Sequence, residues 1–441
     1  MDDILKVRIS LLIIIIALLG FLYIFQNWFD AFWGIIFVLA LVAMYMIYTY
    51  FVIKHQRRKL RKNPIQENPD FKPSITIMVP AHNEACVIEK TIENILKIDY
   101  DNFDVIVIDD RSTDDTKIVV QELAEKYANV RCLIREQDAF PGKSAVLNDA
   151  LKMTNSDAVL VFDADAKVEP DFIRKLLPVF EPDNVGAVQA QKRVMNAKQN
   201  LLTRCQYNEL IFDTYVQIGR DAVKGAVELR GNGELIKRKA LDDIGGWNEE
   251  TITDDLDMST RLHISGWDIR FCPDAIVFEE AVLTYTALIK QRRRWVEGSI
   301  RRYLEFAKEI FTSKDMSLRC GFDLIVYLSE FLLPFWMVSE VALQAFRYVR
   351  DNNNNILSSM LVFLAAGVFF WTGFIYSLQK YSHYSGLKAI WMAFITSIYM
   401  IVFWVPVVFY VILKIIFAPK TMDWGKTVHG VCQGEEKKAN G

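Results

Sequence analysis

The sequence predicts an α/β domain with a mostly parallel sheet and helices on both of its faces, bracketed by transmembrane helices. Two observations lead to this prediction. From Ile75 onward, short apolar or β-branched runs alternate with longer amphipathic segments, which is the pattern of right-handed βαβ units. The hydrophobic content of 52% exceeds that of an ordinary soluble domain, and the excess lies in apolar runs near both ends of the chain.

The alternating region contains four expected strands and three expected helices. We expect strands at residues 75–80, 105–109, 130–134 and 158–163, and helices at 84–98, 114–127 and 143–153. In open sheets of this kind, ligands collect beyond the carboxyl ends of the strands. The polar residues that end these strands are therefore the first candidates for a functional site.

Two apolar runs precede this domain, at residues 9–25 and 32–53, and each approaches the length of about 20 residues that a hydrocarbon core requires. A signal peptide is disfavoured because a second run follows at once without a small-residue cleavage site. The basic run at 54–62 places the following domain on the cytoplasmic side. Nucleic-acid binding is the weaker explanation of this run, since no aromatic-interleaved basic face follows.

Three more apolar runs follow the domain, at residues 322–346, 356–378 and 387–417. The first contains Glu330 and Glu340, and a carboxylate in hydrocarbon costs on the order of 3 kcal/mol, so this run either crosses the membrane or lies at its surface. We therefore expect four or five spans in a multi-pass membrane protein. The expected parts are a transmembrane hairpin at 1–55, a cytoplasmic domain at 56–320, a transmembrane region at 321–418 and a tail at 419–441.

Two carboxylates one residue apart, Asp163 and Asp165, end the fourth expected strand. Such a pair after a buried run is costly unless it meets a cation. Hard divalent ions take oxygen ligands, and Mg²⁺ completes its shell with waters and substrate phosphates. Zinc is disfavoured because no His or Cys residues cluster there. A lone pair of this kind also occurs by chance, so its weight depends on the motifs around it.

Several motifs follow one another in a characteristic order: PAHNE at 80–84, the strand end at Asp109 and Asp110, DAD at 163–165, TDD at 253–255 and QRRRW at 291–295. In this order they resemble the signature of membrane-bound family-2 glycosyltransferases, the group of cellulose, hyaluronan and poly-N-acetylglucosamine synthases. The resemblance covers about residues 75–306. It implies a GT-A fold that binds a UDP-sugar donor.

On the donor side, the resemblance implies that Asp110 contacts the uridine, with Glu84 nearby. It implies that Asp165 ligates the metal. Asp163 is a further candidate ligand of the metal and a candidate for nucleotide binding. The expected cofactor is Mg²⁺, with Mn²⁺ as the alternative. Lys143 opens an expected helix at a place that favours an anion, so it is a further candidate for nucleotide binding. A solvated lysine is the equal alternative.

On the acceptor side, the resemblance implies that Asp255 is the catalytic base and that Gln291, Arg294 and Trp295 line the acceptor and diphosphate site. Polymerising synthases usually have Glu in the middle of the base motif, where this chain has Asp254. Either Asp254 or Asp255 could therefore be the base. An acidic first helical turn, which the helix dipole favours, is the alternative explanation of both residues.

The remaining arginines of this region have a membrane explanation. We expect Arg292 and Arg293 to snorkel toward lipid headgroups, on a face to which Arg301 and Arg302 could also belong. Glycines at 231 and 233 follow a strand-like run at 228–230 and give the backbone freedom for a tight turn or for close approach of a substrate.

A narrower resemblance indicates the product. The segments at 141–148, 162–172, 228–236, 245–257 and 292–306 are similar to cyanobacterial-type β-monoglucosyldiacylglycerol synthases. This resemblance implies inverting transfer of glucose from UDP-glucose to diacylglycerol at the bilayer of the cell membrane or of a thylakoid. The alternatives are a processive polysaccharide synthase and a membrane protein that only binds nucleotide sugar. A lipid acceptor already lies in the bilayer and needs no channel, which favours the lipid product.

Overall fold

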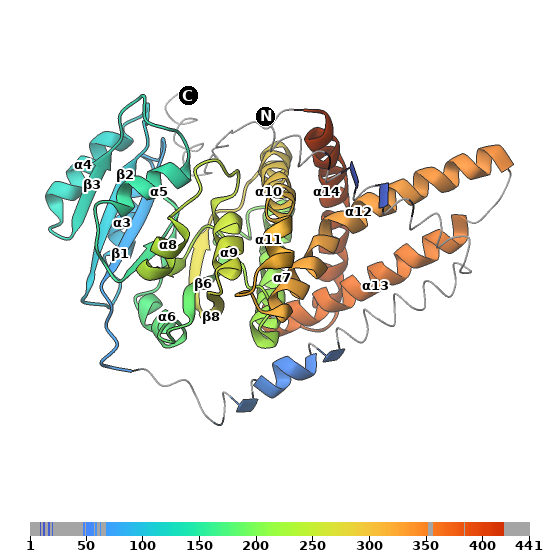
Figure 1. Ribbon diagram of the computed structural model, residues 1–441, viewed down its shortest axis with the longest axis horizontal. Helices are drawn as coiled ribbons and strands as arrows, with labels where there is room; N and C mark the ends of the chain where they lie inside the picture. Colours follow the sequence, from blue (N-terminus) through green and yellow to red (C-terminus); the bar gives the residue numbers. More distant parts are fainter. Residues whose placement is uncertain are drawn as a thin grey trace.

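Figure 1 shows a computed structural model of the chain. The structure describes residues 68–351, 356–382 and 384–418, together with single residues and short runs between residues 9 and 62. Most of the expected hairpin at 1–55 and all of the tail at 419–441 lie outside the described residues.

The first part of the domain alternates strands and helices, as the sequence predicts. These elements are β1 (Ile75–Ala81), α3 (Ile88–Ile95), β2 (Phe103–Asp109), α4 (Thr116–Lys126), β3 (Val130–Ile134), α5 (Lys143–Leu151) and β4 (Ala158–Val161). The second part of the domain contains β5 (Lys167–Val168), α6 (Phe172–Phe180), β6 (Val185–Val194), α7 (Leu201–Val223), β7 (Glu234–Lys237), α8 (Arg238–Ile244), α9 (Asp254–Ile264) and β8 (Asp268–Glu279).

These strands form one eight-stranded sheet in the order β3-β2-β1-β4-β7-β6-β8-β5. Four of its seven pairings are parallel, three of them between β1, β2, β3 and β4 and one between β6 and β8. β7 runs antiparallel to both of its neighbours. The mostly parallel sheet is therefore confirmed. It follows that the carboxyl ends of β1, β2 and β4, where the candidate donor residues lie, meet at one edge.

Helices cover both faces of the sheet (Figure 1), as expected. On one face, residues of α3, α4 and α6 pack against Ile77 and Val79 of β1. On the other face, residues of α5, α8 and α9 pack against Met78, the residue between them. Because side chains alternate across a strand, one β1 sequence supplies both apolar cores.

The helices that follow the sheet pack against one another, and the first three and the last contribute residues to a third apolar core. They are α10 (Tyr285–Glu305), α11 (Ala307–Thr312), α12 (Leu318–Asp351), α13 (Ile356–Tyr381) and α14 (Gly386–Phe417). Val296 on α10 and Val408 and Val411 on α14 belong to this core, and Lys414 on α14 pairs with Glu297 on α10 at 2.7 Å. This packing ties the C-terminal helices to the helix that carries the QRRRW motif.

Within the described residues, one helix is long and apolar enough to cross a membrane. This helix is α14, whose most apolar stretch has a mean hydropathy of 2.5. The runs at 322–346 and 356–378 are helical, as parts of α12 and α13. In the part of the chain that the structure describes there is therefore one candidate span, on the C-terminal side, and not the four or five spans bracketing the domain that we expected.

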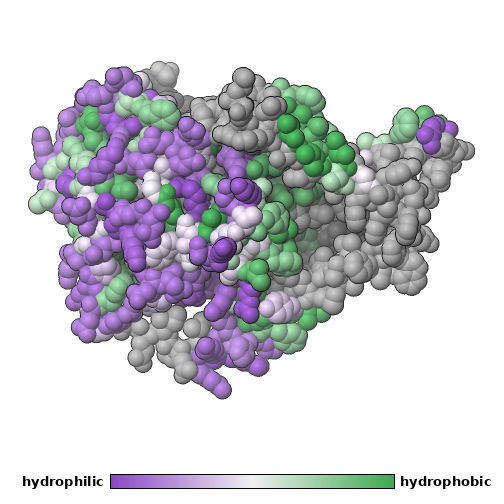
Figure 2. Space-filling model, viewed as in Figure 1, coloured by the Kyte–Doolittle hydropathy of each residue, from purple (hydrophilic) through white to green (hydrophobic). Residues whose placement is uncertain are grey.

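The surface changes character between the sheet and these helices. On the face drawn in Figure 2, hydrophilic residues cover the sheet domain and hydrophobic residues gather beside the C-terminal helices. Trp391 and Val402 on α14 are exposed. An apolar surface of this kind on a 32-residue helix is typical of contact with lipid.

Candidate active site

Lys143 joins three segments that are far apart in the sequence. It is the first residue of α5, and its Nζ donates to Asp163 Oδ1 at 2.7 Å and to the Gly231 carbonyl oxygen at 2.7 Å. The same Nζ lies 4.0 Å from Asp254 Oδ2. Burial alone would lower the pKa of Lys143, but Asp163 and Asp254 outweigh burial and raise it. Lys143 is therefore a fixed cation among the candidate carboxylates.

Asp255 lies in the first turn of α9, where its Oδ1 accepts from the Leu256 N–H at 2.8 Å. Gly231 faces its other oxygen so closely that a Cβ at this position would lie 3.3 Å from Asp255 Oδ2. Protein surrounds Asp255 on most sides, although part of it is exposed. Burial, followed by the like charge of Asp254, raises the pKa of Asp255 to about 6. A carboxyl whose pKa approaches neutrality is suited to proton transfer.

Two residues of this cluster were missed by the sequence reasoning. Glu234, the first residue of β7, is buried and accepts from the Gly231 N–H. Burial and the neighbouring Asp255 raise its pKa to about 8. Lys192 on β6 pairs with Glu279 at 2.7 Å and donates to the Arg230 carbonyl oxygen. Nothing in the local pattern marks either residue, because only the sheet topology places β7 next to β4 and β6 next to β7.

The donor-side carboxylate Asp110 follows β2 and is fully buried. It accepts from Arg111 Nε at 2.8 Å and from Arg135 Nη1 at 2.6 Å. Arg135 was also missed, although it directly follows the third expected strand, where the strand-end rule points. Glu84 is buried beside the end of β1, and its backbone N–H donates to Thr116 Oγ1 at 2.7 Å.

The two candidate metal ligands follow β4. Asp165 Oδ2 accepts from the Glu280 N–H at 3.1 Å. Burial would raise the pKa of Asp163, but Lys143 and Lys192 outweigh it, so the pKa lies below its usual value and the group is ionised. No group of three or more His, Cys, Asp or Glu side chains in the described part of the chain could hold a metal. Two carboxylates fit a hard cation whose other ligands are phosphates and waters.

Helix α10 carries the QRRRW motif and packs closely against the start of α9. A Cβ on Gly298 would overlap the side chain of Thr253, the residue before Asp254, so glycine permits α10 to approach α9 closely. Arg294 contributes to the positive field that lowers the pKa of Asp163. The guanidinium of Arg292 lies 4.2 Å from the ring centroid of Trp295, and Gln291 Oε1 accepts from Arg292 Nη1 at 3.3 Å.

The expected lipid-facing role of the arginines on α10 is wrong for three of them. Arg292, Arg301 and Arg302 are buried, where Arg292 pairs with Glu209 at 2.7 Å and Arg301 pairs with Glu297 at 3.0 Å. Because a buried guanidinium requires a partner, each pair compensates a buried charge, and the Arg292–Glu209 pair also joins α10 to α7. Only Arg293 is exposed, and it lies over the ring of Tyr410 at 4.1 Å.

The expected strand at 228–230 is also wrong. Residues 225–233 form a loop between α7 and β7, called the 225–233 loop below, and β7 begins only at Glu234. Gly231 has a φ of 79° and Gly233 a φ of 72°, so the backbone turns here in a region that favours glycine.

Comparisons with known proteins show which family the chain resembles. The family described as "Glycosyltransferase like family 2" matches residues 73–298, just over half of the chain. The chain is 36% identical to a β-monoglucosyldiacylglycerol synthase of Nostoc sp. over 90% of its length and 84% of the relative's. It is also 36% identical to a β-monoglucosyldiacylglycerol synthase of Synechocystis sp., over 81% of this chain and 75% of that one.

A solved structure supports the fold. The mannosyltransferase PcManGT of Pyrobaculum calidifontis, in complex with GDP-Man and Mn²⁺, matches 82% of this chain and 98% of its own with a TM-score of 0.56 and 20% identity. This likeness shows the α/β GT-A-like fold that was expected. Together with the family match and the relatives, it establishes that the chain belongs to the family-2 glycosyltransferases and is a glycosyltransferase enzyme.

Proposed function

We propose that this enzyme transfers glucose, with inversion, from UDP-glucose to 1,2-diacylglycerol and makes β-monoglucosyldiacylglycerol. The observation that carries the chemistry is the convergence on Lys143 of Asp163 and Asp254, with Asp255 beside them against Gly231. The choice of donor and acceptor is supported by the two relatives, which bear the name of this activity and align over most of the chain.

In the proposed reaction, a hydroxyl oxygen of diacylglycerol attacks the anomeric carbon of glucose while UDP leaves from the opposite face. Asp255 takes the proton of that hydroxyl. Its pKa of about 6 leaves it mostly ionised at neutral pH and still basic enough to accept a proton. Asp254 raises the pKa of Asp255 by its negative charge, so we assign Asp254 a supporting role.

On the donor side, we assign Asp110 and Glu84 to the nucleoside and Lys143 to the diphosphate. Arg294 adds a second cation there, since guanidinium groups bind phosphate oxygens in bidentate fashion. Asp163 and Asp165 would hold a divalent cation, Mg²⁺ or Mn²⁺, which acts as a Lewis acid toward a leaving diphosphate when it is bound.

On the acceptor side, Gln291 and Trp295 lie on α10, the helix that packs on α14. We propose that α14 and the apolar surface beside it lie in the bilayer, with the sheet domain on the cytoplasmic side. A lipid acceptor would then reach Asp255 from the membrane, while UDP-glucose enters from the aqueous phase. No nucleic-acid partner is proposed.

The test uses the full chain in detergent with Mg²⁺, diacylglycerol and, in separate reactions, UDP-glucose, UDP-galactose and UDP-N-acetylglucosamine. We expect one discrete hexosyl-diacylglycerol from UDP-glucose by mass spectrometry and a β linkage by NMR. Asp255→Asn serves as the inactive control.

Two other outcomes would each support a rival function. A ladder of products that differ by one sugar would indicate a processive polysaccharide synthase. Binding of UDP-glucose with no product from the wild type, and no difference between the wild type and Asp255→Asn, would indicate a protein that only binds nucleotide sugar.

A further inference from the structure

Side chains from other elements hold much of the backbone of the 225–233 loop. Five of its backbone N–H groups donate to side-chain oxygens. The acceptors are Asp323 on α12 for Ala226, Gln217 on α7 for Glu228, Ser259 on α9 for Leu229, Gln189 on β6 for Arg230 and Glu234 on β7 for Gly231. The conformation of this loop therefore depends on how five elements are packed together.

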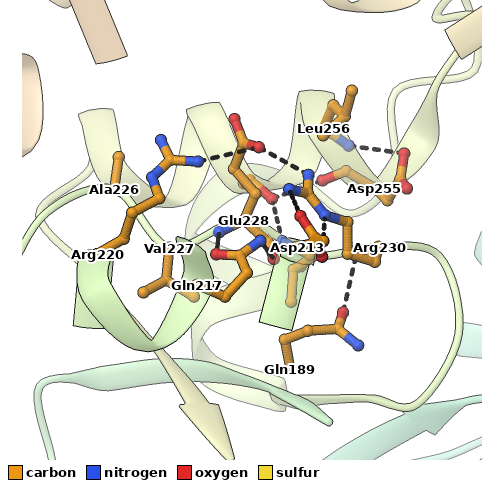
Figure 3. A network of polar contacts seen from close by, with 12 residues as sticks. Gln189, Asp213, Gln217, Arg220, Ala226, Val227, Glu228, Arg230, Asp255 and Leu256 are labelled. Atoms are coloured by element: carbon orange, nitrogen blue, oxygen red, sulfur yellow. Dashed lines mark hydrogen bonds and ion pairs between the residues drawn. The ribbon is translucent and has the colours of Figure 1, made fainter. Parts of the chain in front are cut away.

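Glu228 lies at the centre of this arrangement (Figure 3) and is fully buried. Its carboxylate contacts three guanidinium groups, those of Arg302 on α10, of Arg220 on α7 at 3.2 Å and of Arg230 within the loop at 2.7 Å. Burial alone would raise the pKa of Glu228, but Arg302, Arg220 and Arg230 outweigh burial and hold it well below its usual range. Glu228 is therefore a buried anion that links the loop to two helices.

The same network reaches α12. Arg220 also pairs with Asp323 at 2.6 Å, and Asp323 accepts the Ala226 N–H at 3.0 Å. One guanidinium thus connects the start of the loop with a helix of the C-terminal region. Arg230 has a second partner as well, Asp213 on α7 at 2.8 Å.

At its other end, the loop forms part of the candidate site. The Gly231 carbonyl oxygen accepts from Lys143, and the Gly231 backbone lies against Asp255. The Arg230 carbonyl oxygen accepts from Lys192 at 3.1 Å. A shift of the loop would therefore move the base and two site lysines relative to one another.

We infer that Glu228 is a positioning residue for the transfer reaction: through three arginines it fixes the 225–233 loop against Asp255 and Lys143. The inference rests on the proposed role of Asp255 as the base. Glu228 itself does not touch the reacting atoms. It acts on turnover because small displacements of reacting groups are costly, about 100-fold for 1 Å.

The test compares Glu228→Gln with a matched control, Glu297→Gln. Glu297 is also a buried carboxylate paired with two cations, Arg301 within α10 and Lys414 on α14, and these pairs include no residue of the loop. Each variant removes one buried charge at similar cost in stability. Hydrogen exchange of peptides covering 226–233 reports the loop, and UDP release with and without acceptor reports turnover.

We expect Glu228→Gln to speed exchange in the loop and to lower kcat about 10- to 100-fold, whereas Glu297→Gln lowers the melting temperature and leaves loop exchange and kcat unchanged. Unaltered loop exchange in Glu228→Gln, or faster exchange with an unaltered kcat, would overturn the inference. An equal loss of kcat in both variants would also overturn it, since the effect would then be one of stability.

A second variant covers the case in which Glu228→Gln does not fold. Asp323→Asn removes the negative charge that pairs with Arg220 and weakens the acceptor of the Ala226 N–H, while Glu228 stays in place. It should speed exchange in the same peptides and cause a smaller loss of kcat. Unchanged exchange in this variant contradicts the inference. If the wild type makes no glucolipid, the proposed function fails, while exchange and acceptor-independent UDP release still show whether Glu228 holds the loop.

Discussion

Asp110 and Asp255 are carboxylates from the two halves of the proposed site, and their surroundings are opposite. Asp110, at the parallel β1–β2 edge, is fully buried and accepts from two arginines. Asp255 lies beside antiparallel β7 with Asp254 and Glu234 as neighbours, and its carboxylate accepts from the backbone N–H of Leu256. Two arginines balance the charge of Asp110, whereas other carboxyl groups lie beside Asp255.

This difference separates two tasks. A carboxylate that two arginines hold by hydrogen bonds is fixed in place, which suits a rigid binding site. A carboxylate that is crowded by like charges holds a proton more readily, which suits proton transfer. We therefore propose the parallel half of the sheet as the rigid donor site and the segment around Gly231 as the reaction centre.

The largest expected effect comes from Asp255→Asn. Removal of the base should lower kcat by about 100- to 10,000-fold while UDP binding is retained. Asp110→Asn is the contrasting variant, because it leaves Arg111 and Arg135 without their shared anion and should weaken UDP binding and stability more than kcat. The measurements are steady-state kinetics and calorimetric titration with UDP. Equal losses of kcat in both variants would remove the distinction between the two halves.

The next effect concerns stability. Arg135→Met leaves the buried Asp110 with a single partner and should lower the free energy of unfolding by about 3–5 kcal/mol. Its control is Arg131→Met, which removes a partly exposed pair with Asp104 and should cost about 0–1 kcal/mol. Thermal unfolding, with and without UDP, measures the change in the free energy of unfolding for both variants. A small effect for Arg135→Met would mean that Arg111 alone compensates Asp110.

The same contrast explains what the sequence could predict. The β1 to β4 half follows local rules, so strand periodicity and the strand-end rule led to Asp110, Asp163 and Asp165. The strand-end rule would also have led to Arg135 had it been applied to β3. Glu234 and Lys192 could not be found this way, because antiparallel β7 enters the sheet between β4 and β6 and brings together residues with no shared pattern.

The prediction that arginines of α10 face lipid was wrong for a related reason. Their spacing is that of a basic helix face, and the pattern alone does not show whether partners cover it. The partners of Arg292 and Arg302 are Glu209 on α7 and Glu228 in the loop, each more than 70 residues earlier in the chain. Only the tertiary packing reveals that these guanidinium groups are buried.

A smaller effect is expected from a substitution at one candidate metal ligand, Asp165. Chelation with EDTA should stop turnover, and added Mn²⁺ or Mg²⁺ should restore it. Asp165→Asn should raise the metal concentration for half-maximal activity by at least about tenfold, which is the effect that even the partners of metal ligands have. Lys167→Ala, an exposed change two residues away, is the control. Full activity in EDTA would exclude the proposed cation.

The smallest effect is a shift in the pH profile, and it decides between Asp254 and Asp255. A base acts only when it is deprotonated, so with the pKa of Asp255 raised to about 6, kcat/KM should be level above neutral pH and should fall as the pH drops through about 6. Asp254→Asn removes the like charge that helps to raise this pKa. The inflection should therefore move to lower pH, by on the order of one unit, with activity retained at neutral pH.

The two assignments of the base predict different results for the same pair of variants. If Asp254 were the base, Asp254→Asn would lose turnover at every pH, and Asp255→Asn would keep it. Glu297→Gln, whose carboxylate pairs with Arg301 and Lys414 away from this cluster, should leave the inflection where it is in the wild type. If the inflection moves in Asp254→Asn and not in Glu297→Gln, the carboxylates around Gly231 set the pKa of Asp255.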